Sequence, residues 1–296
     1  MPTPVSPKQA ALALGVSEAS VKRWCDKGLL VPVRTAGGHR RIATAEVVRF
    51  ARESGNALVR PELVGLPSAT TSGKVATERA LDEALDALQE GDEERLIALV
   101  VHLFGSGRSA TDICERVLAP ALHELGSRWE HGAAEIFEER RACEVAQASL
   151  HELARLLPAL PRTAPRALGG TLAGDPYTLS SAMCALALRE LGWRAENLGA
   201  GLPPEELARA IARRRPALVW VSVSGGLNSP ELAKALRTVS DAARRAGAGL
   251  VLGGRSLPAV APAGSRRCER LSDLALAARG AGRKIPRAPT RGPRRR

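Results

Sequence analysis

Short amphipathic segments separated by glycines fill the first part of the chain. Their apolar spacing, with serine and glycine at their boundaries, predicts two short helices, a hairpin around an Ala-Gly-Gly turn, and a third helix. These elements cover residues 6–14, 17–27, 29–42 and 44–54. Two helices joined by a tight turn and followed by a hairpin predict a winged helix-turn-helix domain over residues 1–55.

Helical spacing of apolar residues continues through the middle of the chain, as at Leu96, Leu99 and Leu103. Four such stretches are punctuated by glycines, and they cover residues 75–90, 92–105, 110–130 and 133–157. Amphipathic helices of this kind close naturally as a bundle, so residues 75–157 predict a four-helix bundle. Residues 56–74, which contain Pro, Ser, Thr and Gly, are interpreted as a linker.

Beyond a proline-containing segment, short apolar runs alternate with amphipathic helices. Strands are predicted at residues 168–172, 194–198, 217–223 and 249–252, and helices at 178–191, 204–214 and 230–246. This alternation predicts a flavodoxin-like parallel α/β sheet over residues 168–278, with helices on both faces. The expected fold class is therefore multidomain, α and α/β, and a ligand of the sheet would bind at the carboxyl ends of its strands.

Positive charge is concentrated at the two ends of the chain, whose net charge is +12. Residues 1–60 hold ten Lys/Arg against four Asp/Glu, and residues 279–296 hold eight against none. Basic ends favour a polyanionic partner such as nucleic acid, and residues 279–296 are expected to form a disordered tail. The chain has no apolar run of membrane-spanning length and no secretory signal. Its five cysteines are scattered, so a cytoplasmic protein without a membrane partner is expected.

Basic residues gather on the second predicted helix and on the hairpin that follows it. On the helix they form a polar face opposite Val21 and Trp24, and at the hairpin tip they could grip phosphates or enter a minor groove. The predicted DNA-contacting residues are Ser20, Lys22, Arg23, Lys27, Arg34, Gly37, Gly38, His39, Arg40 and Arg41. A solvated face would carry similar residues, and His39 could either contact phosphate or hold the turn.

The segment SPKQAALALGVSEASVKRWCDKGLLVPVRTAGGHRRI resembles the DNA-binding domain of MerR-type and excisionase-like regulators. That resemblance implies a recognition helix in the major groove of double-stranded DNA and a wing over the backbone. MerR-type proteins usually act as dimers through a long helix that this chain lacks. A homo-oligomer, dimer or tetramer, would therefore form through the bundle or the α/β domain.

Residues 75–278 resemble the bundle-plus-cobalamin module of light-sensing MerR-type repressors that use adenosylcobalamin, and more distantly that of methionine synthase. In that family a D-x-H-x-x-G pattern supplies the axial histidine, and here the matching stretch is Asp175–Ser180, with Tyr177 at the cobalt-ligand position. Arg140 stands where the bundle has its histidine. The resemblance implies cofactor contacts by Trp129, Glu139, Asp175, Tyr177, Ser222, Ser224, Gly253 and Gly254.

Tyrosine is a poorer metal ligand than histidine at neutral pH. A neutral imidazole binds metals directly, whereas phenols ionise near pH 10, so ligation by a phenolate at pH 7 costs roughly 4 kcal/mol. No histidine follows His151 in the chain. Three alternatives stay open: cobalamin held without a protein ligand to its metal, a different ligand in the same crevice, or an empty scaffold for protein contacts.

The expected function is that of a DNA-binding transcriptional regulator, a repressor and not an enzyme. Its C-terminal module would control oligomerisation or sense a ligand, and with Tyr177 at the axial position light control is expected to be weak or absent. Two other classes stay open. One is a corrinoid-carrier or methyl-transfer protein, and the other is a ligand-free module that recruits a partner to DNA.

Overall fold

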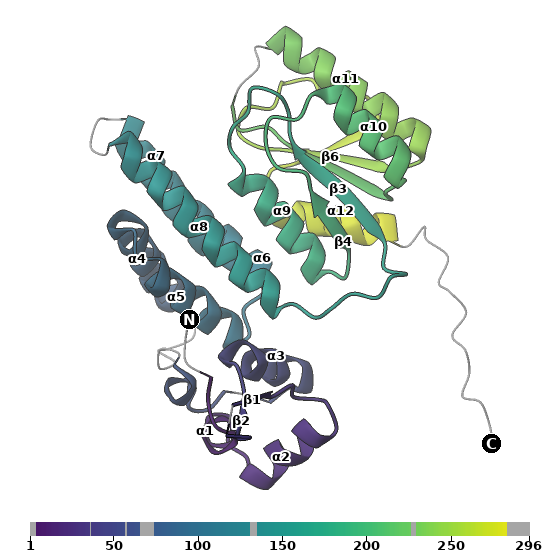
Figure 1. Ribbon diagram of the computed structural model, residues 1–296. Coiled ribbons are helices and arrows are strands. Elements are labelled where there is room, and N and C mark those ends of the chain that lie inside the picture. The colour runs from purple at the N-terminus through teal and green to yellow at the C-terminus, as the bar shows by residue number, and fades with distance from the viewer. Residues whose placement is uncertain are drawn as a thin grey trace, which may run out of the picture. The chain divides into compact units, whose positions relative to one another are not determined.

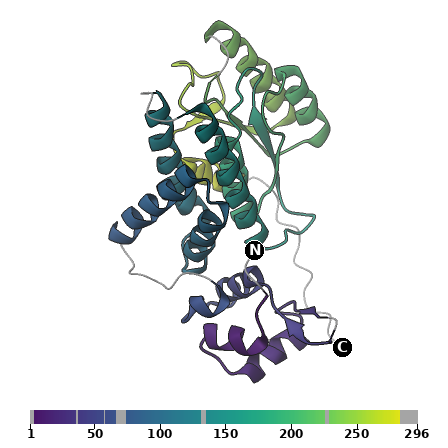
Figure 2. The same cartoon turned by 60° about the vertical axis from the view of Figure 1, so that its left-hand side comes forward.

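The computed structural model describes residues 4–35, 37–56, 58–65, 74–130, 135–225 and 229–282. The chain divides into two compact units, Met1–Ala159 and Leu160–Arg296, each of which has its own core. Figures 1 and 2 show the helices and strands of both units. Among the described residues, none of the helices is long and apolar enough to cross a membrane.

The first unit begins with the predicted winged helix-turn-helix. Its elements are α1 (Pro7–Ala13), α2 (Glu18–Asp26), the antiparallel strands β1 (Val33–Arg34) and β2 (Arg40–Arg41), and α3 (Thr44–Ser54). A capping box between Ser6 and Gln9 starts α1, and the side chain of Ser17 caps α2. The rings of Trp24 and Phe50 pack with centroids 4.5 Å apart, so Trp24 joins α2 to α3.

The rest of the first unit is the predicted helical bundle. Before the bundle, the predicted linker contains the 3-10 helix η1 (Pro61–Val64), which packs on the helix-turn-helix domain, since Thr44 Oγ1 donates to the Val64 carbonyl at 2.7 Å. The bundle contains α4 (Lys74–Glu90), α5 (Glu93–Gly105), α6 (Ala110–Ile113), the π-helical turn η2 (Cys114–Leu118), α7 (Ala119–Glu130) and α8 (Ile136–Leu156). The third predicted helix therefore contains a wide turn. That turn ends two residues before Pro120, which has no N–H for a regular helical bond. Fully buried Leu88, Leu96, Ile113 and Leu153 lie in the core.

The second unit is a five-stranded parallel sheet between two pairs of helices (Figure 1). Along the chain it contains β3 (Arg166–Thr171), α9 (Leu179–Glu190), β4 (Arg194–Asn197), α10 (Pro204–Arg214), β5 (Leu218–Ser222), α11 (Ser229–Ala246), β6 (Gly249–Gly253), β7 (Ser265–Cys268) and α12 (Leu271–Gly282). The strand order is β4-β3-β5-β6-β7. This is the doubly wound, flavodoxin-like order, and the predicted fold class is confirmed.

Alternation along the strands builds a core on each face of the sheet. Leu168, Val219 and Val221 pack with α10 and α11, whereas Trp220 belongs to the cluster that includes α9 and α12. Trp220 lies across Gly169 of the neighbouring strand, where a Cβ would stand 2.2 Å from the indole ring. Glycine at position 169 therefore makes room for the largest fully buried side chain of this unit.

The end of this unit differs from the sequence prediction. Strand β7 and helix α12 were not predicted, and α12 continues to Gly282, beyond the expected domain end at residue 278. Residues 279–282 of the expected tail are thus helical, and residues 283–296 lie outside the described residues. Strand β7 was not predicted because Ser265–Cys268 is a polar edge strand in which only Cys268 is buried, so no apolar run marks it.

Candidate functional site

The exposed face of α2 carries the predicted DNA-reading residues. Lys22, Arg23 and Lys27 are exposed, whereas Val21 is fully buried on the opposite face. Arg23 Nη2 donates a hydrogen bond to Ser20 Oγ at 3.2 Å, and Lys22 Nζ pairs with a carboxylate of the same helix at 2.8 Å. The helix therefore presents an ordered row of cationic and hydroxyl groups to solvent, as a recognition helix requires.

The wing is a tight hairpin tip between β1 and β2. The Thr35 N–H donates to the His39 carbonyl at 2.9 Å, and Gly38 has φ +77°, a left-handed conformation that glycine adopts freely. Arg34 Nη1 donates to the Gly38 carbonyl at 3.3 Å, so Arg34 stiffens the tip. Gly37, His39 and Arg41 are exposed.

Arg40 differs from the other wing cations because it ties the wing to α2. Its guanidinium pairs with Asp26 at 2.8 Å and donates to the Lys22 carbonyl at 3.5 Å, and its side chain is 28% exposed. These partners hold the guanidinium against α2. The geometry supports a positioning role for Arg40, whereas Arg41 is exposed and available for phosphate.

The two neighbouring arginines should therefore respond differently to substitution. Arg40→Met is expected to weaken binding to a selected duplex about threefold to tenfold with little change in salt dependence, because it removes a positioning contact. Arg41→Met should reduce the slope of log K against log salt by about 0.9, the value for one phosphate contact. Salt titrations by fluorescence anisotropy measure both, and Asp26→Asn should reproduce Arg40→Met. A slope change for Arg40→Met equal to that for Arg41→Met would contradict the distinction.

Arg52, which sequence analysis did not single out, connects the helix-turn-helix to the bundle. It projects from the last turn of α3 and donates to the carbonyls of Phe104 and Arg108, at 2.5 and 2.6 Å. Its guanidinium also lies 3.7 Å from the centre of the Phe104 ring. Phe104 lies in the last turn of α5, the negative end of that helix, so a cation is well placed there. The sequence signal was absent, because an arginine in a last helical turn is ordinary.

In the second unit the predicted cofactor residues gather at the carboxyl edge of the sheet. Strands β3 and β5 are neighbours whose chain connections lead in opposite directions, so the loops after them flank the switch point where ligands bind in such folds. Asp175, in the loop after β3, is 3% exposed. Its two carboxylate oxygens accept from the N–H groups of Tyr177, at 3.1 Å, and Ser224, at 2.7 Å. One buried carboxylate thus links the two loops across the switch point.

Hydroxyl groups extend this link to the loop after β6. Ser180 and Ser224 share a hydrogen bond of 3.3 Å, and the Ser224 carbonyl accepts from Arg255 Nε at 3.2 Å and from Ser256 Oγ at 3.0 Å. Thr171 Oγ1 donates to the Asp175 carbonyl at 2.8 Å. The partners that sequence analysis did not include among the site residues are Thr171, Ser180, Arg255 and Ser256. Only their positions at or after the ends of strands could have indicated them.

Tyr177 lies between a glycine and an arginine. A Cβ on Gly225 would stand 3.0 Å from the Tyr177 ring, and the Arg255 guanidinium lies 5.6 Å from the ring centre, within cation–π range. Gly254 has φ +109°, and a Cβ there would meet the Val223 carbonyl oxygen at 2.1 Å. The loops after β3, β5 and β6 are therefore closely fitted around Tyr177, with glycines where they approach.

Ser222 and Gly253 are placed deeper than the loop residues. Ser222 is 3% exposed and hydrogen-bonds to the thiol of Cys184. Burial raises the pKa of the Cys184 thiol to about 12 and that of Cys268 to about 11. A Cβ on Gly253 would stand 3.2 Å from the Cys268 carbonyl oxygen. Because the reactive form of cysteine is the thiolate, these raised pKa values make both thiols weak nucleophiles at neutral pH.

The two predicted contacts in the bundle lie near the ends of α7 and α8. Trp129 is in the last turn of α7, and its side chain lies outside what the structure describes. Glu139 is in the first turn of α8 and is half-buried. Burial raises the pKa of the Cys143 thiol to about 11, and the nearby Glu139 carboxylate adds to this rise.

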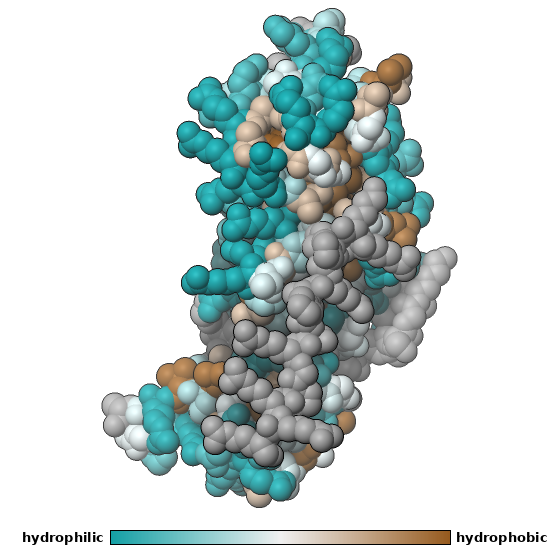
Figure 3. Space-filling view, turned by 90° about the vertical axis from the view of Figure 1, so that its right-hand side faces the viewer, coloured by the Kyte–Doolittle hydropathy of each residue, from teal (hydrophilic) through white to brown (hydrophobic). Residues whose placement is uncertain are grey.

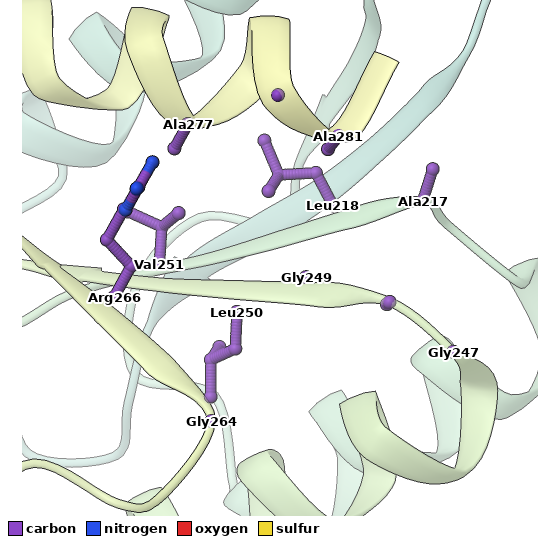
Figure 4. Close-up of a pocket in the computed structure, with 12 residues that line it drawn as sticks. Ala217, Leu218, Gly247, Gly249, Leu250, Val251, Gly264, Arg266, Ala277 and Ala281 are labelled. Carbon is purple, nitrogen blue, oxygen red and sulfur yellow. The ribbon is translucent and has the colours of Figure 1, made fainter. Parts of the chain in front are cut away.

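A hollow of about 570 Å³ lies at the opposite, amino edge of the sheet (Figure 4). It is lined mainly by glycine, alanine and aliphatic residues at the starts of β5 and β6 and in the last turns of α12. The Arg266 guanidinium lies beside Ala277 in Figure 4. The hollow is therefore remote from Asp175 and Tyr177, which occupy the edge where the fold binds ligands.

The donors at the carboxyl edge suit part of a corrinoid but not its metal. Hydroxyls, backbone amides and Arg255 can hold the polar periphery and phosphate of a nucleotide-like tail. The histidines of the chain all precede residue 152, so this unit offers no imidazole to cobalt. Among the described residues, no group of three or more His, Cys, Asp or Glu could hold a metal ion. The residues therefore do not fit a metal-ligating role.

Family comparisons agree with this architecture. The helix-turn-helix domain family matches residues 5–55, and B12 binding domain families match residues 80–154 and 165–284. The chain combines a helix-turn-helix domain with two B12 binding domains. The first B12 match falls on the bundle and the second on the α/β unit.

Whole-chain comparisons give distant relatives. The chain is 28% identical to the HTH-type transcriptional repressor CarH of Myxococcus xanthus over 284 residues, which are 89% of this chain and 91% of CarH. It is 27% identical to CarA of the same organism over 222 residues, 70% of this chain and 72% of CarA. The monomethylamine corrinoid protein of Methanosarcina barkeri aligns with a TM-score of 0.58 and 15% identity, covering 68% of this chain and 98% of that one. That likeness shows a shared fold.

Proposed function

We propose that this chain is a transcriptional repressor that binds double-stranded DNA through its helix-turn-helix and wing, and that it has no enzymatic activity. The observation that carries the proposal is the ordered cationic face of α2, to which Arg40 fixes the wing. The two distant relatives, CarH and CarA, are transcriptional repressors, which supports the same assignment. The protein would act in the cytoplasm as a homo-oligomer, a dimer or tetramer, assembled through its bundle or α/β domain.

The B12-binding-like module is proposed to be a degenerate sensor. Asp175, Ser224 and Arg255 would hold the polar tail of a corrinoid, with Trp129 and Glu139 as the bundle contacts implied by the family resemblance. Tyr177 would occupy the place of the axial histidine. When bound, adenosylcobalamin supplies a light-sensitive cobalt–carbon bond. Since position 177 carries no imidazole to trap cobalt afterwards, control of DNA binding by light should be weak or absent.

Selection of duplexes from a random library tests the DNA-binding half. The full-length chain should enrich a defined sequence and bind it at least ~10³-fold more tightly than unrelated duplex, as specific regulators do. Arg23→Gln with Arg41→Gln should remove this preference, and illumination in the presence of adenosylcobalamin should change the affinity less than twofold. Failure to enrich any sequence would contradict the repressor proposal.

Gel filtration after dark incubation with adenosylcobalamin tests the module. A retained corrinoid spectrum supports the degenerate-sensor proposal. A colourless protein that still binds its selected duplex would indicate that the C-terminal module is a ligand-free interaction module. Stoichiometric methyl transfer from bound methylcobalamin, without sequence-selective DNA binding, would favour the corrinoid-carrier class instead.

A further inference from the structure

Arginines cluster at the amino edge of the α/β sheet, opposite the candidate ligand site. Strand β3 starts at Arg166 and β4 starts at Arg194, and these two residues are direct partners in the parallel register. Helix α10 ends beside them, because Arg166 Nη1 donates to the carbonyl of Arg214 at 3.5 Å. Six of the described arginines share this corner, and all are exposed: Arg162, Arg166, Arg194, Arg213, Arg214 and Arg215.

Most of this charge is not neutralised by carboxylates. Arg194 Nη1 donates to the carbonyl of Arg162 at 3.0 Å, so backbone oxygens orient the guanidiniums of both Arg166 and Arg194. Among these six arginines, the ion pair that the structure shows is that of Arg214 with Glu196, at 3.5 Å. Like charges that face each other across neighbouring strands are destabilising. The positive charges gathered at this corner therefore lower the stability of the fold.

The backbone conformation of Arg215 is a second, independent feature of this corner that lowers stability. It ends α10 in a left-handed conformation with φ 47°, whereas the other described residues with positive φ are glycines. Glycine is the usual residue at such a helix end because a Cβ is strained there. An outlier of this kind is reason to look for a function.

The basic corner continues along the edge on the other side of the hollow. Arg244 and Arg245 lie in the last turn of α11, where Arg244 pairs with Asp241 at 2.7 Å, and Arg266 lines the hollow. Helix α12 ends on the same edge, since Gly280 and Ala281 line the hollow. In Figure 3 hydrophilic side chains surround a paler, more apolar area in the upper part of the view, over the α/β unit.

Helix dipoles explain part of this pattern but not all of it. Arginines in the last turns of α10 and α11 complement the negative ends of those helices. Arg162, Arg166 and Arg194 lie outside helices, and Arg166 and Arg194 begin strands. From β4 to β6 the edge spans three strand spacings, about 14 Å. That distance is close to the width of a DNA major groove, about 12 Å.

We propose that the amino edge of the α/β unit is a second DNA-binding surface, which contacts the phosphate backbone of duplex DNA without reading sequence. Exposed arginines oriented by backbone carbonyls are suited to phosphate, and positioning contacts of this type carry no base specificity. The choice of DNA over other polyanions rests on the proposed function of the helix-turn-helix, which brings duplex to the same chain.

The test uses the full-length chain and a duplex of random sequence. Arg214→Gln with Arg215→Gly should weaken binding about tenfold at low salt and reduce the slope of log K against log salt by about 2, as expected for two lost phosphate contacts. Arg215→Gly relieves the left-handed strain, so the unfolding midpoint should not fall. Arg267→Gln with Arg270→Gln is the matched control, because it removes equal charge from β7 and the segment after it. The control should leave the slope within experimental error.

A slope change that is the same in the test and control pairs would overturn the proposal, because it would reflect net charge alone. No change in the test pair would overturn it too. Binding to phosphatidylglycerol vesicles that depends on Arg214 and Arg215, without an effect on DNA, would assign the surface to a membrane instead. If the helix-turn-helix proposal is wrong, the parent chain shows no sequence preference, but the difference in salt slope between the test pair and the control pair remains.

Discussion

Tyr177→His is expected to increase the retention of cobalamin at least tenfold. A neutral imidazole ligates metal at pH 7, whereas a phenol must first lose its proton at a cost of roughly 4 kcal/mol. That cost corresponds to an upper limit of about 1,000-fold in affinity. Histidine is smaller than tyrosine, so it fits between Gly225 and Arg255 without displacing either. Absorbance after gel filtration in the dark measures both the amount bound and the ligation of cobalt.

The matched control for this experiment is Tyr177→Phe, which keeps the ring and removes the hydroxyl. It should retain no more corrinoid than the parent chain and should show no imidazole-ligated spectrum. Equal retention by Tyr177→His and Tyr177→Phe would mean that cobalt does not approach position 177. The degenerate-site interpretation would then be wrong, and the loops around Asp175 would serve a different ligand or none.

Asp175→Ala is expected to destabilise the α/β unit by about 3 to 5 kcal/mol. The carboxylate is 3% exposed and accepts hydrogen bonds from the N–H groups of Tyr177 and Ser224, both of which would lose their partner. A hydrogen bond to a charged group contributes about 1.5 to 3 kcal/mol, and an unsatisfied buried donor adds a penalty. Urea unfolding, followed by the fluorescence of Trp193 and Trp220 in this unit, measures the loss.

Two further variants separate this role from a general effect of charge. Asp175→Asn keeps one acceptor oxygen and should cost about half as much. Asp241→Ala removes an exposed carboxylate that pairs with Arg244 on α11, and its effect should stay below about 0.5 kcal/mol. If Asp175→Ala and Asp241→Ala changed the unfolding midpoint equally, Asp175 would not be the link between the loops after β3 and β5.

The local pattern of the sequence was sufficient for most of the architecture. Ser6, Ser17 and the glycines around the wing mark element boundaries through capping and turn chemistry, which act over a few residues. The same holds for the change from helical spacing to alternating strands and helices after residue 157. Asp175 and Ser224 were expected as cofactor contacts through the family resemblance, and the structure places both at the carboxyl edge of the parallel sheet.

Sequence alone determined that a basic winged helix-turn-helix precedes a helical bundle and a parallel α/β sheet, and that this sheet has no histidine for cobalt. Tertiary structure decided the rest. It placed β7 at the sheet edge, turned Arg40 inward to Asp26, seated Arg52 at the end of α5, and brought Arg166, Arg194 and Arg214 together. Periodicity records which side of an element is buried, but the partner of a long charged side chain depends on which distant backbone lies within its reach. Such contacts follow from strand register and helix packing, and no local pattern encodes them.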